Sequence, residues 1–159
     1  RHPRARLDVL DAAEAMLDHA REALAHRPEI AARMRLLCDH LPSSQLPSNS
    51  YDAVLSNSLL HHLVDPAALW QTIARCGRPG AAVCIMDLLR PADAAGADAL
   101  VATHAAEAPD VLKRDFRNSL FAAYEIDEVS QQLSAAGLGC LQAHRISDRH
   151  LAVSGFLPA

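Results

Sequence analysis

Residues 51–66 read YDAVLSNSLLHHLVDP and join a strand, a polar turn and the start of a helix. Residues 53–55 form a short apolar run of the kind that is buried in a sheet. Small polar residues and a histidine pair follow, and then Asp65-Pro66, a dipeptide that favours the start of a helix. In an open α/β sheet, polar residues directly after a strand mark the carboxyl edge, where ligands bind. The stretch therefore predicts an α/β fold with a ligand site at the carboxyl end of this strand.

The rest of the chain alternates between strand and helix patterns. The expected strands cover residues 7–11, 34–38, 52–56, 81–88, 138–146 and 151–157, and the expected helices cover residues 12–26, 65–76, 116–124 and 128–136. Pro28 is expected to end the first helix, and residues 77–80 to form a sharp turn. The last two strands are separated by a tight connection that indicates an antiparallel hairpin. This order predicts an α/β domain with a mostly parallel sheet, buried on both faces at residues 81–88.

Length and composition are typical of one soluble globular domain. The chain has 159 residues, half of them apolar, and a net charge of -4. Positive charge is not in excess, which argues against nucleic-acid binding through a basic surface. The chain contains no apolar run of about 18 residues, so we expect no membrane span. The basic residues 1–6 are not followed by an apolar segment, so we do not expect them to be a signal peptide.

The cysteines are far apart in the sequence and form no metal-binding or disulfide pattern. None of them lies within four residues of another. We therefore expect them to be small buried apolar residues of a cytoplasmic protein in a reducing compartment. The chain also contains no histidine–carboxylate metal motif, so no metal is predicted. The four cysteines are Cys38, Cys76, Cys84 and Cys140.

Polar residues end three successive expected strands. Asp11 ends the first strand, Asp39 follows the second and Asn57 follows the third. The carboxyl ends of parallel strands meet at one edge of a sheet, so we expect these side chains to converge there. A carboxylate such as Asp11 can accept hydrogen bonds from two neighbouring ribose hydroxyls. The simpler alternatives are that Asp11 caps the helix starting at Ala12 and that Asp39 is a solvated loop acid.

Three passages together resemble one enzyme family. Residues 51–66 resemble the fourth conserved segment of class I S-adenosylmethionine-dependent methyltransferases, "(F/Y)DxVxSNxxLHHLxDP". Residues 38–52 resemble the family's passage "gDaxxLPfxdxsFD", with His40 in place of a small residue. Residues 78–87 resemble "LrPGGxlxixD", with Ala81 in place of the second glycine. The resemblance covers residues 7–88 and implies a Rossmann-like sheet with helices on both faces.

The resemblance implies S-adenosylmethionine as cofactor and a small-molecule methyl acceptor. It assigns the ribose to Asp11, the adenine amino group to Asp39 and the adenine ring to the backbone amide of His40. The cofactor-binding residues that it implies are Asp11, Ala12, Met16, Asp39, His40, Asn57 and Ser58. Of these, Asn57 and Ser58 are expected beneath the methionine part. Neither the acceptor atom nor the oligomeric state can be read from the sequence.

A catalytic residue is less clearly indicated than the cofactor site. His61 and His62 are candidates for a general base at neutral pH. The alternative is that one histidine stacks near the cofactor and the other packs on the sheet, because positioning the nucleophile does most of the work in methyl transfer. Asp87 and Arg90 end the strand at 81–88, where they form an ion pair with each other, cap a helix or contact substrate. Residues 92–124 are expected to form a cover over the substrate.

The glycine-rich first segment of the family does not occur in this sequence. Its expected place is about 20 residues before Asp11, ahead of Arg1. We therefore expect a methyltransferase domain without its first strand, with open strand edges at 7–10 and 53–56. On this basis the parent protein transfers methyl groups, whereas the chain alone binds the cofactor weakly and is weak or inactive.

Two other functions share part of the pattern. An NAD(P)-dependent Rossmann oxidoreductase would also carry an acid like Asp11, but it would not account for Asp39 or for residues 57–62. The sequence also contains no Tyr-x-x-x-Lys pair for hydride chemistry. The second alternative is a non-catalytic scaffold with a methyltransferase-like fold. Binding of S-adenosylhomocysteine and of NAD separates the methyltransferase from the oxidoreductase. A strand and loop with Gly-x-Gly upstream of Arg1 would favour the enzyme over the scaffold.

Overall fold

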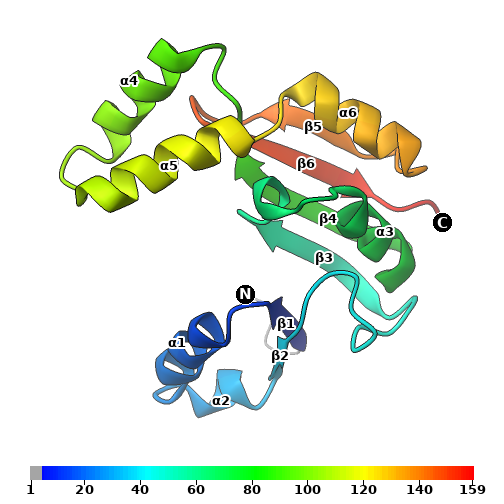
Figure 1. Ribbon diagram of the computed structural model, residues 1–159. Helices are drawn as coiled ribbons and strands as arrows, with labels where there is room; N and C mark the ends of the chain where they lie inside the picture. Colours follow the sequence, from blue (N-terminus) through cyan, green and yellow to red (C-terminus); the bar gives the residue numbers. More distant parts are fainter. Residues whose placement is uncertain (1–4) are drawn as a thin grey trace. The chain divides into compact units, whose positions relative to one another are not determined.

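The computed structural model describes residues 5–159 and forms two compact units (Figure 1). The first unit extends to Pro47 and the second runs from Ser48 to Ala159. That residues 1–159 form a single domain stays a prediction. No described helix combines the length and the apolar character that crossing a membrane requires.

The first unit is a parallel strand pair connected by helices. It contains β1 (Leu7–Asp11), α1 (Glu14–Leu24), α2 (Pro28–Ala31) and β2 (Met34–Cys38). The two strands pair along their whole length, from Leu7 opposite Met34 to Asp11 opposite Cys38, so their carboxyl ends are level. The predicted strands are confirmed, but α1 is shorter at both ends than the expected helix over residues 12–26. Pro28 begins α2, because proline fits the first turn of a helix, where its missing N–H needs no partner.

The second unit is a four-stranded sheet with helices packed on it. The strand order is β3-β4-β6-β5, with β3 parallel to β4 and with antiparallel pairing of β4 to β6 and of β6 to β5. Among the described residues, β1 pairs only with β2, and β3 only with β4. The elements are β3 (Tyr51–Asn57), η1 (Leu60–His62), α3 (Ala67–Cys76), β4 (Gly77–Leu88), α4 (Ala94–His104), α5 (Asp110–Ala122), α6 (Ile126–Ala135), β5 (Gln142–Arg145) and β6 (His150–Phe156).

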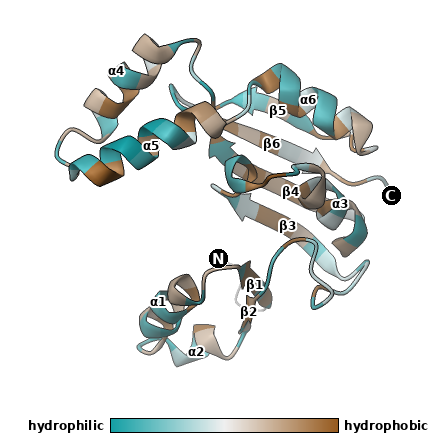
Figure 2. Ribbon diagram, in the orientation of Figure 1, coloured by the Kyte–Doolittle hydropathy of each residue, from teal (hydrophilic) through white to brown (hydrophobic). Residues whose placement is uncertain are grey.

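The core of the second unit lies between the sheet and helices α3 and α6. Figure 1 shows both helices on one face of the sheet, and they pack against each other as well as against β4 and β5. Trp70 and Ile73 of α3 and Leu133 of α6 are fully buried, as are Ile85 and Val153 of the sheet. Figure 2 shows β4 and β6 as largely hydrophobic, in keeping with this core. The predicted α/β class and the C-terminal antiparallel hairpin are confirmed.

Strand β4 differs from its prediction in length and in burial. It begins at Gly77 rather than at residue 81, because the expected turn is a bulge: Tyr51 pairs with Gly77, but Ala53 pairs with Ala82. Gly80 has a φ of 75°, which a side chain would disfavour, and its N–H donates to Leu157 O at 3.2 Å. Beyond the bulge, burial alternates, so only one face of the strand is well buried.

Residues 92–124 form two helices, where only weak helical character and a short helix at 116–124 were expected. Asp93 begins α4 by accepting a hydrogen bond from Gly96 N at 2.7 Å, which compensates for the weak periodicity of this helix. α4 and α5 enclose a small core beside the end of β4, made of Leu88, Ala97, Leu120 and Ala123. The role of these residues as a substrate cover stays a prediction.

The expectation that all four cysteines are buried is wrong. Only Cys76 is buried, whereas Cys38, Cys84 and Cys140 are exposed. Cys84 lies between the buried residues Val83 and Ile85, so the alternation of the strand turns it to the open face. The apolar character of a cysteine does not by itself determine on which face of a strand it lies.

Candidate functional site

Asp11 and Asp39 lie side by side at the carboxyl ends of β1 and β2 in the first unit. The N–H of Asp39 donates to the carbonyl of Asp11 at 3.2 Å, which continues the strand pairing by one residue. Oδ1 of Asp11 accepts a hydrogen bond from Ala13 N at 2.8 Å. Asp11 is not the N-cap residue of α1, because that position is held by Ala13. Oδ2 of Asp11 has no hydrogen-bond partner among residues 5–159. One carboxylate oxygen therefore supports the turn, and the other makes no hydrogen bond within residues 5–159.

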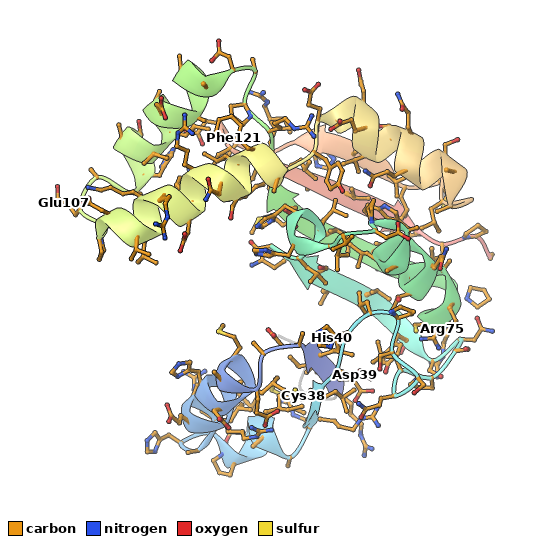
Figure 3. The ribbon with its side chains drawn as sticks, viewed as in Figure 1. Cys38, Asp39, His40, Arg75, Glu107 and Phe121 are labelled. Carbon is orange, nitrogen blue, oxygen red and sulfur yellow. The ribbon has the colours of Figure 1, made fainter. Side chains whose placement is uncertain are left out.

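The carboxylate of Asp39 is bound by its own loop. Its Oδ2 accepts from Ser43 Oγ at 2.6 Å and from Gln45 Nε2 at 3.2 Å, and its Oδ1 accepts from His40 N at 2.8 Å. The Ser43 hydroxyl, then Gln45 and then the His40 amide lower the pKa of Asp39. Figure 3 shows Asp39 and His40 just beyond the end of β2. The two groups assigned to adenine by the sequence thus bond to each other.

Ala12 and Met16 follow Asp11 on the way into α1. The carbonyl of Ala12 accepts a weak hydrogen bond from Cys38 Sγ at 3.8 Å, which holds the start of the turn against the end of β2. Met16 lies in the first turn of α1 with 56% of its surface exposed. An exposed methionine is an adaptable apolar contact surface for a flat ligand.

Asn57 and Ser58 end β3 in the second unit with exposed side chains. Asn57 is the last residue of the strand and pairs with Met86 of β4, one residue later than the predicted strand end. Ser58 has a φ of 53°, in the left-handed region, and its N–H donates to Met86 O at 2.9 Å. A non-glycine residue in this region costs about 1–2 kcal/mol and often marks a functional turn. The chain reverses here and enters η1.

Asp87, at the end of β4, is a buried carboxylate with three donors. Its Oδ1 lies 2.5 Å from His61 Nδ1 and accepts from Leu88 N at 2.8 Å, and its Oδ2 accepts from Leu60 N at 2.7 Å. The side chains of His61 and Asp87 are only 4% and 1% exposed. Burial of an ionised carboxylate requires such partners, and the three donors supply them. Asp87 therefore fixes η1 to the end of β4.

Of the three alternatives for Asp87 and Arg90, the ion pair between the two residues does not form. Arg90 instead donates from Nε to the carbonyl of Ala123 at 2.8 Å and pairs with Glu128 at 3.0 Å. These contacts fasten the end of α5 to the start of α6. The reason is local: β4 ends at Leu88, so the two residues lie on different segments with different neighbours.

His62 differs from His61 in exposure and in environment. Its side chain is exposed, and its ring lies 4.0 Å from that of His61 with an interplanar angle of 40°. Partial burial and then the neighbouring His61 lower the pKa of His62 below its ordinary value of 6.5, and Asp87 opposes this shift. The lowered pKa favours the neutral ring, which can accept a proton.

The sequence treats the two histidines alike and misses the partner of His61. One signal could have found it: an acid at the end of one strand and a histidine just after the parallel neighbouring strand share one edge. Two hollows on the surface of the described residues lie elsewhere and are not lined by His61, His62 or Asp87. One, of about 220 Å³, is lined by Gly77, Pro79 and Leu157, and the other, of about 330 Å³, by Arg21, Leu24 and Pro28.

Solved structures of similar fold include several that are named as methyltransferases. An S-adenosylmethionine-dependent methyltransferase from Aquifex aeolicus has a TM-score of 0.66 and 17% identity over 96% of this chain and 69% of its own. An O-methyltransferase family protein from Burkholderia thailandensis has a TM-score of 0.67 and 19% identity over 99% of this chain and 46% of its own. An arsenic(III) S-adenosylmethionine methyltransferase from Chlamydomonas reinhardtii has a TM-score of 0.65 and 16% identity over 97% of this chain and 55% of its own.

The chain thus spans from about half to seven-tenths of the length of these structures. No curated protein is similar enough in sequence to count as a relative. At these identities the structures establish the fold, and family membership rests on the sequence. The family model described as a methyltransferase domain matches residues 1–85, more than half of the chain. The chain therefore belongs to the methyltransferase-domain family.

Proposed function

We propose that the protein carrying this chain transfers a methyl group from S-adenosylmethionine to a small-molecule acceptor. The observation that carries the proposal is the pair of acids at the level ends of β1 and β2, with Oδ2 of Asp11 making no hydrogen bond within residues 5–159. A carboxylate in this position is suited to the two hydroxyls of a ribose. When bound, S-adenosylmethionine supplies an electrophilic methyl group on its sulfonium.

The adenosyl part is assigned to the first unit. Asp11 accepts the ribose hydroxyls through Oδ2, while its Oδ1 keeps the bond to Ala13 N. Ala12 and the exposed side chain of Met16 offer apolar contacts to the adenine ring. Asp39 already accepts three hydrogen bonds, and a carboxylate has about four acceptor positions, so one remains for the adenine amino group. The backbone N–H of His40 can donate a hydrogen bond to adenine only if it breaks its present hydrogen bond to Asp39.

The methionine part is assigned to Asn57 and Ser58 of the second unit. An asparagine side chain both donates and accepts, so it can serve the carboxylate as well as the ammonium of an amino acid. The left-handed turn at Ser58 leaves both side chains exposed beyond β3. A small acceptor fits the net charge of -4, which gives no general attraction to nucleic acid. The similar structure from Chlamydomonas reinhardtii is named as a methyltransferase of arsenic(III), which is a small acceptor.

Calorimetry with S-adenosylhomocysteine and with NAD tests the proposal on the protein that carries this chain. We expect S-adenosylhomocysteine to bind and NAD not to bind. Asp11→Asn keeps an oxygen for Ala13 N but removes the charge, so it should weaken binding by about 10- to 100-fold. Asp18→Asn is the matched control, because Asp18 lies on α1 of the same unit in an exposed pair with Arg21. Binding of NAD in place of S-adenosylhomocysteine, or equal affinities of the two variants, would overturn the proposal.

A further inference from the structure

Helix α4 is held to the rest of the second unit by few side chains. Of its described residues only Ala97 is buried, and α5 is the element against which it mainly packs. Its last residue, His104, reaches the turn between β5 and β6, where its ring lies beside Asp148 and Arg149. Figure 1 shows α4 and α5 at the end of the sheet where β5 and β6 meet in this turn. A helix with so little burial opens locally, so a single contact can control how often α4 opens.

The turn that His104 reaches is fixed by hydrogen bonds of its own. The carbonyl of Arg149 accepts from Leu89 N at 2.9 Å, which fastens the turn to the end of β4. Ser147 Oγ accepts from the backbone N–H of His150 at 3.0 Å and from that of Arg149 at 3.3 Å. The hydroxyl proton of Ser147 can then be donated to Nδ1 of His150, 2.9 Å away. His104 therefore connects a weakly packed helix to a turn that has little freedom.

Nε2 of His104 has two neighbours that require opposite states of its proton. It lies 2.6 Å from Oδ2 of Asp148 and 2.9 Å from Nη1 of Arg149. A carboxylate oxygen only accepts, so Nε2 must carry a proton to bond with Asp148. A guanidinium only donates, so Nε2 must be without a proton to bond with Arg149. The two hydrogen bonds therefore exclude each other, and loss of the Nε2 proton exchanges one partner for the other.

The bond to Asp148 is the stronger of the two. The same carboxylate accepts from Nη1 of Arg149 at 3.1 Å through Oδ1, so it lies between a guanidinium and the imidazole. The hydrogen bond from His104 is the main cause that lowers the pKa of Asp148, so this acid stays ionised over the range in which a histidine titrates. His104 also lies in the last turn of α4, where the helix dipole favours a cation. An ion pair forms only while His104 is protonated, and it binds more strongly than a neutral ring binds Arg149.

The other charged and titratable groups around His104 have positions or partners of their own. Burial and then Arg149 lower the pKa of His150, on β6, below its ordinary value of 6.5. Figure 3 shows Glu107 at the outer tip of the loop between α4 and α5. The charged residues of α5 have partners on α4 or on α5 itself, as the pairs Arg117–Asp98, Lys113–Asp110 and Arg114–Asp115. Asp148 and Arg149 are therefore the groups that determine what His104 binds.

We propose that His104 is a proton-dependent latch, which holds the end of α4 to the β5–β6 turn through Asp148 when protonated and through Arg149 when neutral. The latch is tighter in the protonated state, so α4 opens more often as the pH rises through the range in which a histidine titrates. The latch itself does not depend on the proposed function. Its consequence for the enzyme does: α4 belongs to the predicted cover of the acceptor, so the latch sets how often that cover opens.

The first test is nitrogen-15 NMR of the His104 ring in the protein that carries this chain, between about pH 5 and about pH 9. We expect Nε2 to carry a proton in acid and to lose it in base, where the proton of the neutral ring stays on Nδ1. Arg149→Met removes the donor to Nε2, so the neutral ring should then keep its proton on Nε2, beside Asp148. An Nε2 proton that persists at high pH in the wild type, or an unchanged tautomer in Arg149→Met, would overturn the proposal.

The second test is hydrogen exchange at about pH 8 and about pH 6, corrected for the intrinsic exchange rates. Protection of the last turn of α4 should rise about fivefold at the lower pH, while that of β4 does not rise. Asp148→Asn keeps an acceptor oxygen but removes the charge, so the rise should shrink to about twofold or less. His104→Gln should also remove the rise, because a glutamine can donate to Asp148 but does not titrate. His144→Gln, a change of an exposed histidine on β5, is the matched control and should keep the full rise.

The exchange experiment also separates the latch from the proposed function. An equal rise in the wild type and in Asp148→Asn, or a rise that disappears in His144→Gln, shows that His104 and Asp148 do not hold α4. Binding of S-adenosylhomocysteine is measured on the same samples. Absence of that binding with an intact pH response of α4 contradicts the proposed function only, and binding without a pH response contradicts only the latch.

Discussion

The indole N–H of Trp70 donates a hydrogen bond of 2.9 Å to Oε1 of Gln132 and so joins helices α3 and α6. Trp70 is 1% exposed, so its N–H has no access to bulk water as an alternative partner. Buried indole groups usually find such a partner, because an unsatisfied donor costs about 1–3 kcal/mol. The contact connects the two helices that cover the core of the second unit.

Gln132→Leu is predicted to destabilise the protein by about 1–3 kcal/mol, because it leaves the indole N–H of Trp70 unsatisfied. The free energy of unfolding is measured in urea. Gln131→Leu is the control, since Gln131 is the exposed neighbour on the same helix and its loss should change stability by about 0.5 kcal/mol or less. Equal effects of the two substitutions would show that the Trp70 bond contributes nothing.

Gly137 ends α6 in a conformation that other residues avoid. Its φ is 71°, and nothing lies within 4 Å of an added Cβ, so the cost of a side chain there is purely one of backbone strain. Gly137→Ala is therefore predicted to destabilise the protein by about 1–2 kcal/mol. Gly139→Ala, where the added Cβ also has open space but no positive φ is required, should be close to neutral. A calorimetric melt of both variants compares them, and a larger effect at Gly139 would contradict the prediction.

Acid is predicted to weaken the second unit through His62 and His150. Burial is the main cause that lowers the pKa of each ring in the folded protein, so the unfolded chain takes up protons first as the pH falls. This contribution to stability is complete above the ordinary value of 6.5 and is lost as the pH falls through the folded pKa values. Urea unfolding above and below this range, in the wild type and in His150→Gln, should show a smaller loss in the variant. A wild type more stable in acid would contradict the sign.

The fold was readable from the sequence where local signals and tertiary structure agree. The apolar runs that end in Asp11 and Asn57 are strands, and Gly137 follows α6 as predicted. The start of β4 was not readable, because Gly77 and Gly80 favour a turn locally. Pairing with Tyr51 and with Leu157 makes them part of the strand, and these partners are distant in sequence.

The positions of the candidate site residues could be predicted from the sequence, but their hydrogen-bond partners could not. Asp11 and Asp39 are adjacent, as the order of the strands predicts. The pairing of Asp87 with His61 depends on the register of β4 beside β3 and on the left-handed turn at Ser58, and neither has a local signature in the sequence. A serine in that conformation is uncommon, since glycine or asparagine is the usual choice.

Helices α4 and α5 are predicted to separate locally when Arg117 is changed. Arg117 joins them by a 2.6 Å contact from Nε to Asp98 Oδ1, and its guanidinium lies 4.8 Å from the ring centre of Phe121 on α5, labelled in Figure 3. Both charged side chains are partly exposed, so Arg117→Met should cost about 1 kcal/mol or less in global stability.

The larger effect of Arg117→Met should appear in hydrogen exchange, because locally stable contacts limit the opening of single helices. Amide protection in α4 should fall by about fivefold, the equivalent of about 1 kcal/mol, while that of β4 stays unchanged. Arg114→Met is the matched control, since Arg114 lies on α5 but makes only an exposed contact with Asp115 of 3.6 Å. If both variants exchange alike, or if β4 loses protection together with α4, the two helices do not open as a separate unit and the Asp98–Arg117 pair does not hold them.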